Sequence, residues 1–496
     1  MRLHHYAATS TLVQALDELA GTLAGHMNPE PDQALASGAY GGSRLTGADL
    51  EAPPALAYDG RGRPFTHPEL AGELAPEDHE ILDAIGAESE WMTELLASLV
   101  REPTVLHEED PGQAVVAQAL REVGLDPVNV RMDAEALRAH PAHSPFDWDV
   151  SSKRNVVATW TPGATDHGRS LILNGHVDVV SPEPLGQWPR DPFSAERVDG
   201  WLYGRGAADM KCGLAAMLGA VKGLRALGLA PHAPVTVESV VEEECTGNGT
   251  LATLLAGYTA EAAVIAEPFG AAITTSQVGV LWFRVRIRGV PGHAAEGRHT
   301  VNAIEKSLEI IAALRDLERE LNQHPPAPYD RFSHPINLNV GAIQGGDWAS
   351  TVPGECVTHY RIALYPRMEV PLVRARIEAI VAAASLEDPE FLAHPPEVLY
   401  GGFACEGYEV WEESPLVTTL GQAFTRQAGS PPALVATTGT TDARVFGLHF
   451  GIPAVCFGPY AEQAHGVDER VYLPSVVQTA QVMGLFVKDW CGLSAG

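Results

Sequence analysis

The chain is poor in basic residues, in closely spaced cysteines and in long apolar stretches, and each shortage excludes a class of protein. Its 33 Lys and Arg stand against 63 Asp and Glu, which gives a formal net charge of -30. The negative electrostatic field of such a chain repels nucleic acid and anionic membranes, so we expect neither as a partner. No stretch approaches the ~20 apolar residues of a membrane span, and the N-terminus lacks the apolar stretch of a secretory leader.

The cysteines are too scattered to form a zinc-binding pair. A disulfide framework is also implausible in a chain of this length. We therefore expect free thiols and a cytoplasmic protein. The six positions are Cys212, Cys245, Cys356, Cys405, Cys456 and Cys491.

A chain of 496 residues is too long for one hydrophobic core, so two or three domains are expected. Residues 1–75 suggest an arm with one amphipathic helix and a Pro/Gly-rich linker. Strand and helix signals alternate over residues 76–277, which predicts an α/β domain with a largely parallel central sheet. Residues 278–391 read as an inserted α+β unit, in the order strand, helix, strand, strand, helix. The first pattern resumes over residues 392–496.

Acids and imidazoles recur where predicted apolar strands end, the edge at which open α/β sheets carry active sites. His176 and Asp178 are two residues apart, so on an extended chain they project from the same face. The Asp178 carboxylate is then placed to fix the ring of His176 for a metal. Asp209 precedes a predicted helix, and Glu267 and His465 follow later strands. Each residue alone has a structural explanation, such as a helix N-cap for Asp209, but five in one domain favour a single site.

The three consecutive glutamates in "VVEEECTGNGT", residues 242–244, follow a β-branched strand. A surface loop of acids is the simplest interpretation, because a buried carboxylate costs several kcal/mol unless a cation compensates it. Together with the other candidates, however, two histidines and three or four carboxylates exceed the needs of one tetrahedral zinc. They suit a pair of divalent cations ~3.5–4 Å apart that share a carboxylate. One glutamate then remains free as a general base.

The motifs "NGHVDVV", "GRGAADMKCG", "VVEEECTGNG", "AEPF" and "AHGVDE" occur in the order found in the co-catalytic zinc hydrolases. Residues 76–496 resemble this family, which includes acetylornithine deacetylase, succinyl-diaminopimelate desuccinylase, aminoacylase and a carboxypeptidase that cleaves glutamate from folates. The resemblance implies a zinc-peptidase-like catalytic domain with a central mixed, mostly parallel sheet flanked by helices. It also implies that residues 278–391 form a ferredoxin-like lid or dimerisation domain, with catalytic parts at 76–277 and 392–496.

The resemblance assigns a role to each metal-facing residue. His176 and Glu267 would hold one cation, Glu244 and His465 the other, and Asp209 would bridge both. The cofactor is then a pair of divalent ions, expected to be zinc, although cobalt and manganese also suit such ligands.

The family's other functional residues can be carried over to matching positions. Asp178 would orient His176, Glu243 would be the general base, and Arg361 would bind a substrate carboxylate through its guanidinium fork. His293 would reach the partner subunit's site to stabilise the oxyanion, so we expect a homodimer formed through the lid. Further substrate contacts are expected at Ser350, Gly439, Thr440, Asp442 and Arg444.

These assignments predict an amidohydrolase that removes an acyl group from a small N-acyl amino acid. The phrases "EEECTGNG", "NVGAIQGGDWASTVP" and "WCGL" most resemble the acetylornithine deacetylase branch, so N-acetyl-L-ornithine, an intermediate of arginine biosynthesis, is the expected substrate. An N-formyl pyrimidine deformylase and a dipeptidase of the same family are alternatives. A non-catalytic metal-binding relative is a more distant one, because all the ligand and base positions are present.

Overall fold

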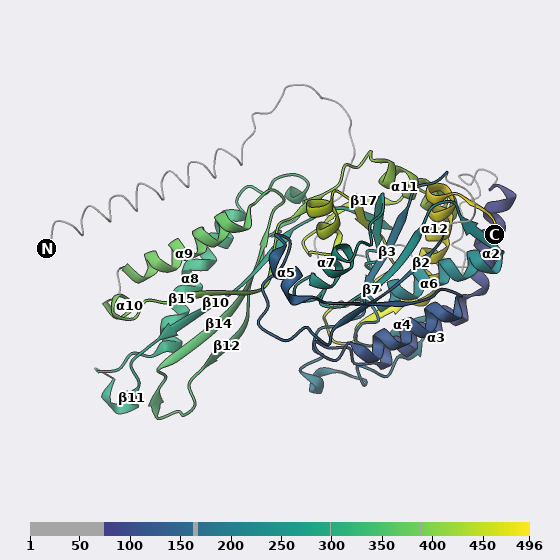
Figure 1. The fold of residues 1–496 in the computed structure, drawn as a ribbon. Coiled ribbons are helices and arrows are strands. Elements are labelled where there is room, and N and C mark those ends of the chain that lie inside the picture. Colours follow the sequence, from purple (N-terminus) through teal and green to yellow (C-terminus); the bar gives the residue numbers. More distant parts are fainter. Residues whose placement is uncertain (1–73, 162–166, 298, 387–388) are drawn as a thin grey trace, which may run out of the picture.

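The computed structural model describes residues 74–496, apart from 162–166, 298 and 387–388, so the expected N-terminal helix and linker lie outside the described residues. The described chain forms two domains side by side (Figure 1). A large domain is built on a nine-stranded sheet, and a small domain on a four-stranded sheet. Each has a hydrophobic core of its own.

The sheet of the large domain is mixed, as predicted. Its strands follow the order β1-β2-β7-β3-β8-β18-β9-β16, and β17 pairs with β9. Neighbours from β7 through β3 and β8 to β18 are parallel, whereas β1, β2 and β16 pair antiparallel at the two flanks. The strands are Val128–Arg131 (β1), Arg154–Trp160 (β2), Leu171–His176 (β3), Val235–Val240 (β7), Ala262–Ile265 (β8), Ala272–Gln277 (β9), Tyr408–Glu409 (β16), Ala433–Thr437 (β17) and Ala454–Cys456 (β18).

Helices cover this sheet and pack on one another. Both α6 and α12 contact β3, and α2 and α3 pack against α6 and α12. No helix of the described residues is long and apolar enough to cross a bilayer, and all six cysteines are free thiols. The helices of this domain are Pro76–Ala87 (α2), Ser89–Arg101 (α3), Asp110–Glu122 (α4), Ala134–Ala139 (α5), Lys211–Ala226 (α6), Asn248–Leu255 (α7), Pro415–Ala428 (α11) and Leu473–Cys491 (α12).

The parallel centre of the sheet explains why distant motifs meet. Strand β3 ends at His176, β7 ends two residues before Glu242, and β8 ends two residues before Glu267. Because these three strands are adjacent and parallel, their carboxyl ends lie at one edge of the sheet.

A second, four-stranded sheet of the large domain joins residues 196–203 to residues 461–472. Its order is β19-β20-β5-β4, and β20 pairs with β5, so that Arg470 lies opposite Tyr203. This pairing brings the loop of His465 next to the loop of Asp209. The strands are Glu196–Val198 (β4), Trp201–Tyr203 (β5), Ala461–Glu462 (β19) and Arg470–Tyr472 (β20), and a separate pair joins Leu229–Pro231 (β6) to Leu493–Ala495 (β21).

The small domain has the expected ferredoxin-like βαββαβ order, with antiparallel strands arranged β12-β14-β10-β15. Helices α8 and α9 pack on the sheet, and two short strands, β11 and β13, pair near its outer end (Figure 1). The elements are Gly279–Arg288 (β10), Gly292–His293 (β11), Ala303–Leu321 (α8), Leu338–Gly345 (β12), Thr351–Val352 (β13), Glu355–Leu364 (β14), Val370–Leu386 (α9), Pro389–Ala393 (α10) and Glu397–Cys405 (β15).

Strand β15 corrects the expected end of the inserted unit. It pairs with β10 up to Cys405, so the small sheet extends past the boundary placed at residue 391. The sequence does not predict this strand because Gly401 and Gly402 interrupt its apolar pattern, and glycine is unfavourable within strands.

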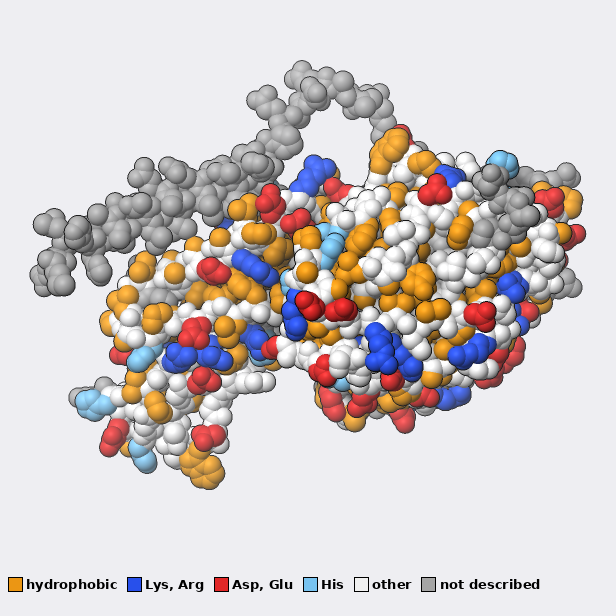
Figure 2. All heavy atoms as spheres, in the orientation of Figure 1, with side chains coloured by type: hydrophobic (Ala, Val, Ile, Leu, Met, Phe, Trp, Pro, Cys, Tyr) orange, Lys and Arg blue, Asp and Glu red, His pale blue; other side chains and the backbone are white. Residues whose placement is uncertain are grey.

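Acidic, basic and apolar side chains are interspersed over both domains on the face shown in Figure 2, with acids gathered along the lower edge of the large domain.

Helix α6 approaches the end of β8 so closely that only glycine fits. A Cβ atom at Gly213 would lie 2.0 Å from the carbonyl oxygen of Ala266, the residue before Glu267. We therefore expect Gly213→Ala to lower the free energy of unfolding by about 1–3 kcal/mol through overpacking, although alanine favours helices. Urea denaturation measures this change.

Gly186 supplies the matched control, because a Cβ there would meet nothing within 4 Å. Gly186→Ala should leave the free energy of unfolding within about 0.5 kcal/mol of the wild type. Equal effects of the two substitutions would contradict the close approach of α6 to β8.

Candidate metal centre

Two histidines and one aspartate form the middle of the cluster at the sheet edge. His176 Nε2 lies 3.1 Å from Asp209 Oδ1, and His465 Nε2 lies 3.3 Å from Asp209 Oδ2. His465 Nε2 is also 3.0 Å from Glu244 Oε1. Each oxygen of Asp209 thus faces a different histidine, which is the arrangement that a bridging carboxylate needs.

Two further glutamates face His176. Its Nε2 is 3.7 Å from Glu267 Oε1 and 3.9 Å from Glu243 Oε2. The other oxygen of Glu243, Oε1, is buried and has no hydrogen-bond partner among the described residues. The structure therefore brings together all six residues that the sequence placed at the metals and the base.

Asp209 is not the N-cap of the helix that follows it. Helix α6 begins at Lys211, its N-cap is Met210, and no side chain caps it. The carboxylate of Asp209 is instead turned toward the two imidazoles. The simpler interpretation of this residue, as a helix cap, is therefore wrong.

The expected role of Asp178 is divided between its backbone and its side chain. The ring Nδ1 of His176 bonds the backbone carbonyl of Asp178 at 2.9 Å, whereas the carboxylate is 3.6 Å away, too far for a hydrogen bond. The carboxylate instead accepts the N–H groups of Glu243 at 3.3 Å and Glu244 at 3.1 Å. Asp178 thus orients His176 with its carbonyl and the glutamate loop with its side chain.

Glu242, the first of the three glutamates, faces away from the cluster. It is fully buried, with a left-handed backbone (φ 63°). Trp148 Nε1 donates to its Oε1 at 2.7 Å, Thr246 donates to its Oε2 at 2.8 Å, and the ammonium of Lys153 lies 3.5 Å away. Glu242 therefore shapes the loop that presents Glu243 and Glu244.

The charges of the cluster shift the pKa values of its histidines upward. The carboxylate of Glu244 raises the pKa of His465 to about 11, and Asp209 adds to the effect. Burial would lower the pKa of His176, but its hydrogen bond to Asp209 and the neighbouring acids raise it well above the usual value. Burial would raise the pKa of Asp209, but its hydrogen bonds to both histidines lower it.

The histidines only partly offset the burial of the other acids. Burial raises the pKa values of Glu243 and Glu267 well above the usual range, and that of Asp178 to about 7. An imidazole and carboxylate donor set with an unpartnered buried oxygen fits divalent cations of the zinc, cobalt and manganese group.

Arg444, expected to contact substrate, is committed elsewhere. It is 2% exposed, and its guanidinium donates to the carbonyls of Thr441 at 2.5 Å and Thr246 at 3.2 Å. Asp442 lies beside it at 3.6 Å. These bonds tie the loop after β17 to the glutamate loop, and we assign Arg444 to that positioning. Gly439 and Thr440 lie half-buried in the same loop.

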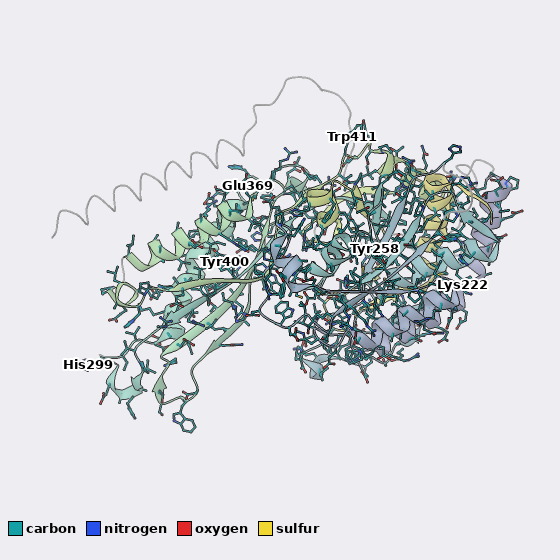
Figure 3. All side chains as sticks on the ribbon, viewed as in Figure 1. Lys222, Tyr258, His299, Glu369, Tyr400 and Trp411 are labelled. Carbon is teal, nitrogen blue, oxygen red and sulfur yellow. The ribbon has the colours of Figure 1, made fainter. Side chains whose placement is uncertain are left out.

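His293 and Ser350 lie far from the cluster of their own chain. Both belong to the exposed outer end of the small domain, where Ala294 N–H donates to the Ser350 carbonyl at 3.0 Å. Strand β11, which ends at His293, marks this end in Figure 1, and His299 is labelled there in Figure 3.

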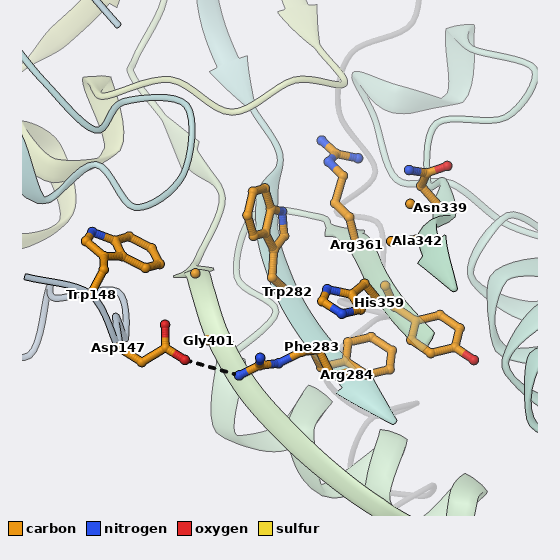
Figure 4. A pocket seen from close by; sticks show the side chains of 13 residues that line it. Asp147, Trp148, Trp282, Phe283, Arg284, Asn339, Ala342, His359, Arg361 and Gly401 are labelled. Carbon is orange, nitrogen blue, oxygen red and sulfur yellow. Dashed lines mark ion pairs between the residues drawn. The ribbon is translucent and has the colours of Figure 1, made fainter. Parts of the chain in front are cut away.

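Arg361 lines a cavity of about 400 Å³ where the two domains meet. Figure 4 shows Trp148 of the large domain on one side, with Trp282, His359 and Arg361 of the small domain on the other. An ion pair of 3.6 Å between Asp147 and Arg284 closes one end. Sequence reasoning misses the two tryptophans, because no motif marks them and only the fold brings them together.

Comparison with known proteins places the chain in a family. Residues 172–489 match Peptidase family M20/M25/M40. An N-formyl-4-amino-5-aminomethyl-2-methylpyrimidine deformylase of Halalkalibacterium halodurans is 31% identical over 70% of this chain and 85% of its own length. A succinyl-diaminopimelate desuccinylase of Magnetococcus marinus is 29% identical over 61% of this chain and 79% of its own.

A solved structure shows the same fold. The dinuclear metal-binding M20 peptidase of Bacillus subtilis superposes with a TM-score of 0.52 at 15% identity, over 82% of this chain and 99% of that one. The fold, the residues gathered at the sheet edge and the sequence similarity agree. The chain therefore belongs to peptidase family M20/M25/M40, metal-dependent hydrolases of amide bonds.

Proposed function

We propose that this protein is a two-metal amidohydrolase that removes the acyl group from a small N-acyl amino acid. The observation that carries the proposal is the position of Asp209 between His176 and His465, with the unpartnered oxygen of Glu243 beside them. A binding protein would have no use for this spare carboxylate.

Two divalent cations would be held by the residues of the cluster. His176 and Glu267 would hold one, Glu244 and His465 the other, and Asp209 both. Zinc, cobalt and manganese all suit these donors, and the Bacillus subtilis relative is named for a dinuclear site. When bound, such cations polarise the scissile carbonyl and acidify the attacking water.

Glu243 would move the proton of the reaction. Its carboxylate would take a proton from the attacking water and then give it to the leaving amine, and burial, which raises its pKa, strengthens it as a base. Asp178 holds the N–H of Glu243 at 3.3 Å and so keeps the base in place.

The cavity at Arg361 would take the amine half of the substrate. No acidic side chain of the described residues pairs with the guanidinium, whose pKa is lowered by burial. A substrate carboxylate would supply the missing charge, as in N-acetyl-L-ornithine. The relatives are named as a pyrimidine deformylase and desuccinylases rather than as acetylornithine deacetylases. The choice of amine in this proposal therefore rests on the cavity and not on similarity.

The aromatic walls of the cavity favour a second candidate. Trp148 and Trp282 offer ring faces to a flat group. An N-formyl aminomethylpyrimidine, the substrate in the name of the relative that is 31% identical, carries such a ring.

His293 would complete the site of a second subunit. It is exposed at the outer end of the small domain, and strand β12 at the sheet edge leaves one side unpaired among the described residues. A dimer joined through this edge would carry each His293 toward its partner, where one donor to the oxyanion is worth about 3–4 kcal/mol.

Glu243→Ala is expected to reduce amine release by about 10²–10⁴-fold, because the general base is lost. We would measure turnover of N-acetyl-L-ornithine, an N-formyl aminopyrimidine and a dipeptide by zinc- or cobalt-loaded protein, with bound metal counted in parallel. The variant should keep both cations. Wild-type protein that binds two cations but releases amine from no N-acyl substrate would contradict the amidohydrolase.

Metal binding to the metal-free protein is expected to release protons. The carboxylates of Glu244 and Asp209 raise the pKa of His465 to about 11, so its imidazole holds a proton that a cation must displace. The apparent affinity should therefore rise with pH between about 6 and 8. Calorimetry in buffers of different ionisation enthalpy measures the released protons, and a pH-independent affinity would contradict this ligand set.

Mixing two inactive variants tests whether His293 acts across the dimer. His293→Ala and Glu243→Ala subunits should together recover about a quarter of wild-type turnover after reassortment of a two-fold dimer. Each mixed dimer then contains one complete site. If His293 serves its own chain, the mixture stays as inactive as its components.

A further inference from the structure

A fully buried carboxylate lies behind the bridging aspartate. Glu469 is 0% exposed, and its Oε1 accepts three backbone N–H groups of one loop: Gly206 at 2.9 Å, Ala208 at 3.0 Å and Asp209 at 3.0 Å. A carboxylate that accepts several N–H groups holds its loop in one conformation. Glu469 therefore fixes the backbone of the residue whose side chain faces both histidines.

A buried arginine connects this carboxylate to the second histidine. Arg205 is 3% exposed, its Nη1 donates to Glu469 Oε2, and its Nη2 donates to the backbone carbonyl of His465 at 3.2 Å. The ring of Trp188 covers the guanidinium at 5.3 Å. One ion pair thus contacts the two loops that present Asp209 and His465.

The loop of His465 needs such support. His465 has a left-handed backbone, with φ 63°, which is uncommon for residues other than glycine and is kept only where neighbours enforce it. The side chain of His465 is half exposed, so packing around this side chain does not fix the conformation of the loop. The hydrogen bond from Arg205 to its carbonyl supplies a fixed contact from the core.

We propose that Arg205 and Glu469 are a positioning pair for the metal centre, an inference that rests on the proposed function. Replacing a buried ion pair by apolar residues is often neutral or stabilising, so stability alone is a weak reason for such a pair. Residues that orient metal ligands, by contrast, typically change metal affinity by 10–100-fold when mutated.

The two members of the pair have different effects. Glu469 holds Asp209, which faces both cation positions. Loss of Glu469 should therefore weaken the binding of both cations. The Nη2 contact of Arg205 reaches only His465. Loss of this contact should therefore weaken only the binding of the cation that Glu244 and His465 would hold. This asymmetry separates positioning from general stability.

Zn²⁺ titration of metal-free protein by calorimetry, with a competing chelator, tests the proposal. Glu469→Gln keeps the size of the side chain but removes its charge, and both cations should bind roughly 10–100-fold more weakly. Arg205→Lys keeps the charge opposite Glu469 but loses the planar fork. Only the cation at Glu244 and His465 should then bind more weakly. The visible spectrum of the Co²⁺-loaded protein, a readout independent of turnover, should change in both variants.

Asp78→Asn is the matched control, because Asp78 is a 3% exposed acid paired with Lys488 at 2.7 Å between α2 and α12. It should lower the free energy of unfolding and leave both cation affinities unchanged. If Glu469→Gln does not fold, Arg205→Lys, which keeps both charges, carries the test.

Three results would overturn the positioning pair. Variants that bind both cations as the wild type does, and lose only stability, would show a structural pair. Equal weakening of both cations in Arg205→Lys would contradict the separate roles. Wild-type protein that binds no cation would overturn the metal centre and the pair together, whereas the first two results leave the metal centre in place.

Discussion

The structure depends on compensation of like charge where the parallel strands at the centre of the large sheet end. Asp209, Glu243, Glu244 and Glu267 repel one another there, and burial raises the pKa values of Glu243 and Glu267. Adjacent parallel strands hold the three glutamates together, because their ends cannot separate without breaking the ladder between β3, β7 and β8, whereas Asp209 is held by its backbone hydrogen bond to Glu469. A rigid sheet that gathers negative charge in this way has the donor groups that divalent cations require.

Much of this centre could be predicted from the sequence because its residues end recognisable strands. His176 closes an apolar strand, and the glutamates and Glu267 follow two others. The role of Asp178 could be predicted only in part. Its carbonyl and its carboxylate are both within reach of a histidine two residues earlier, and the spacing cannot tell which one bonds the ring.

The remaining features depend on contacts between distant segments. Glu469 and Gly206 are 263 positions apart, and Trp148 and Glu242 are 94 apart. Nothing local to either residue records such a contact, since glutamates in polar loops and tryptophans after proline-containing turns occur in many different structural environments. Strand β15 could not be predicted for a related reason: its pairing with β10 stabilises a segment whose two glycines disfavour a strand.

The cavity between the domains bears on the choice of substrate. A half-buried guanidinium without an acidic partner is costly, and Arg361 has none among residues 74–496 as far as the structure describes them, although the chain carries an excess of acids. A neutral pyrimidine would stack on Trp148 and Trp282 but leave Arg361 uncompensated. An amine that bears a carboxylate would pair with Arg361, and its carbon skeleton would still contact the aromatic walls. An uncompensated charge costs more than an unstacked ring face, which is why we propose the N-acyl amino acid ahead of the pyrimidine.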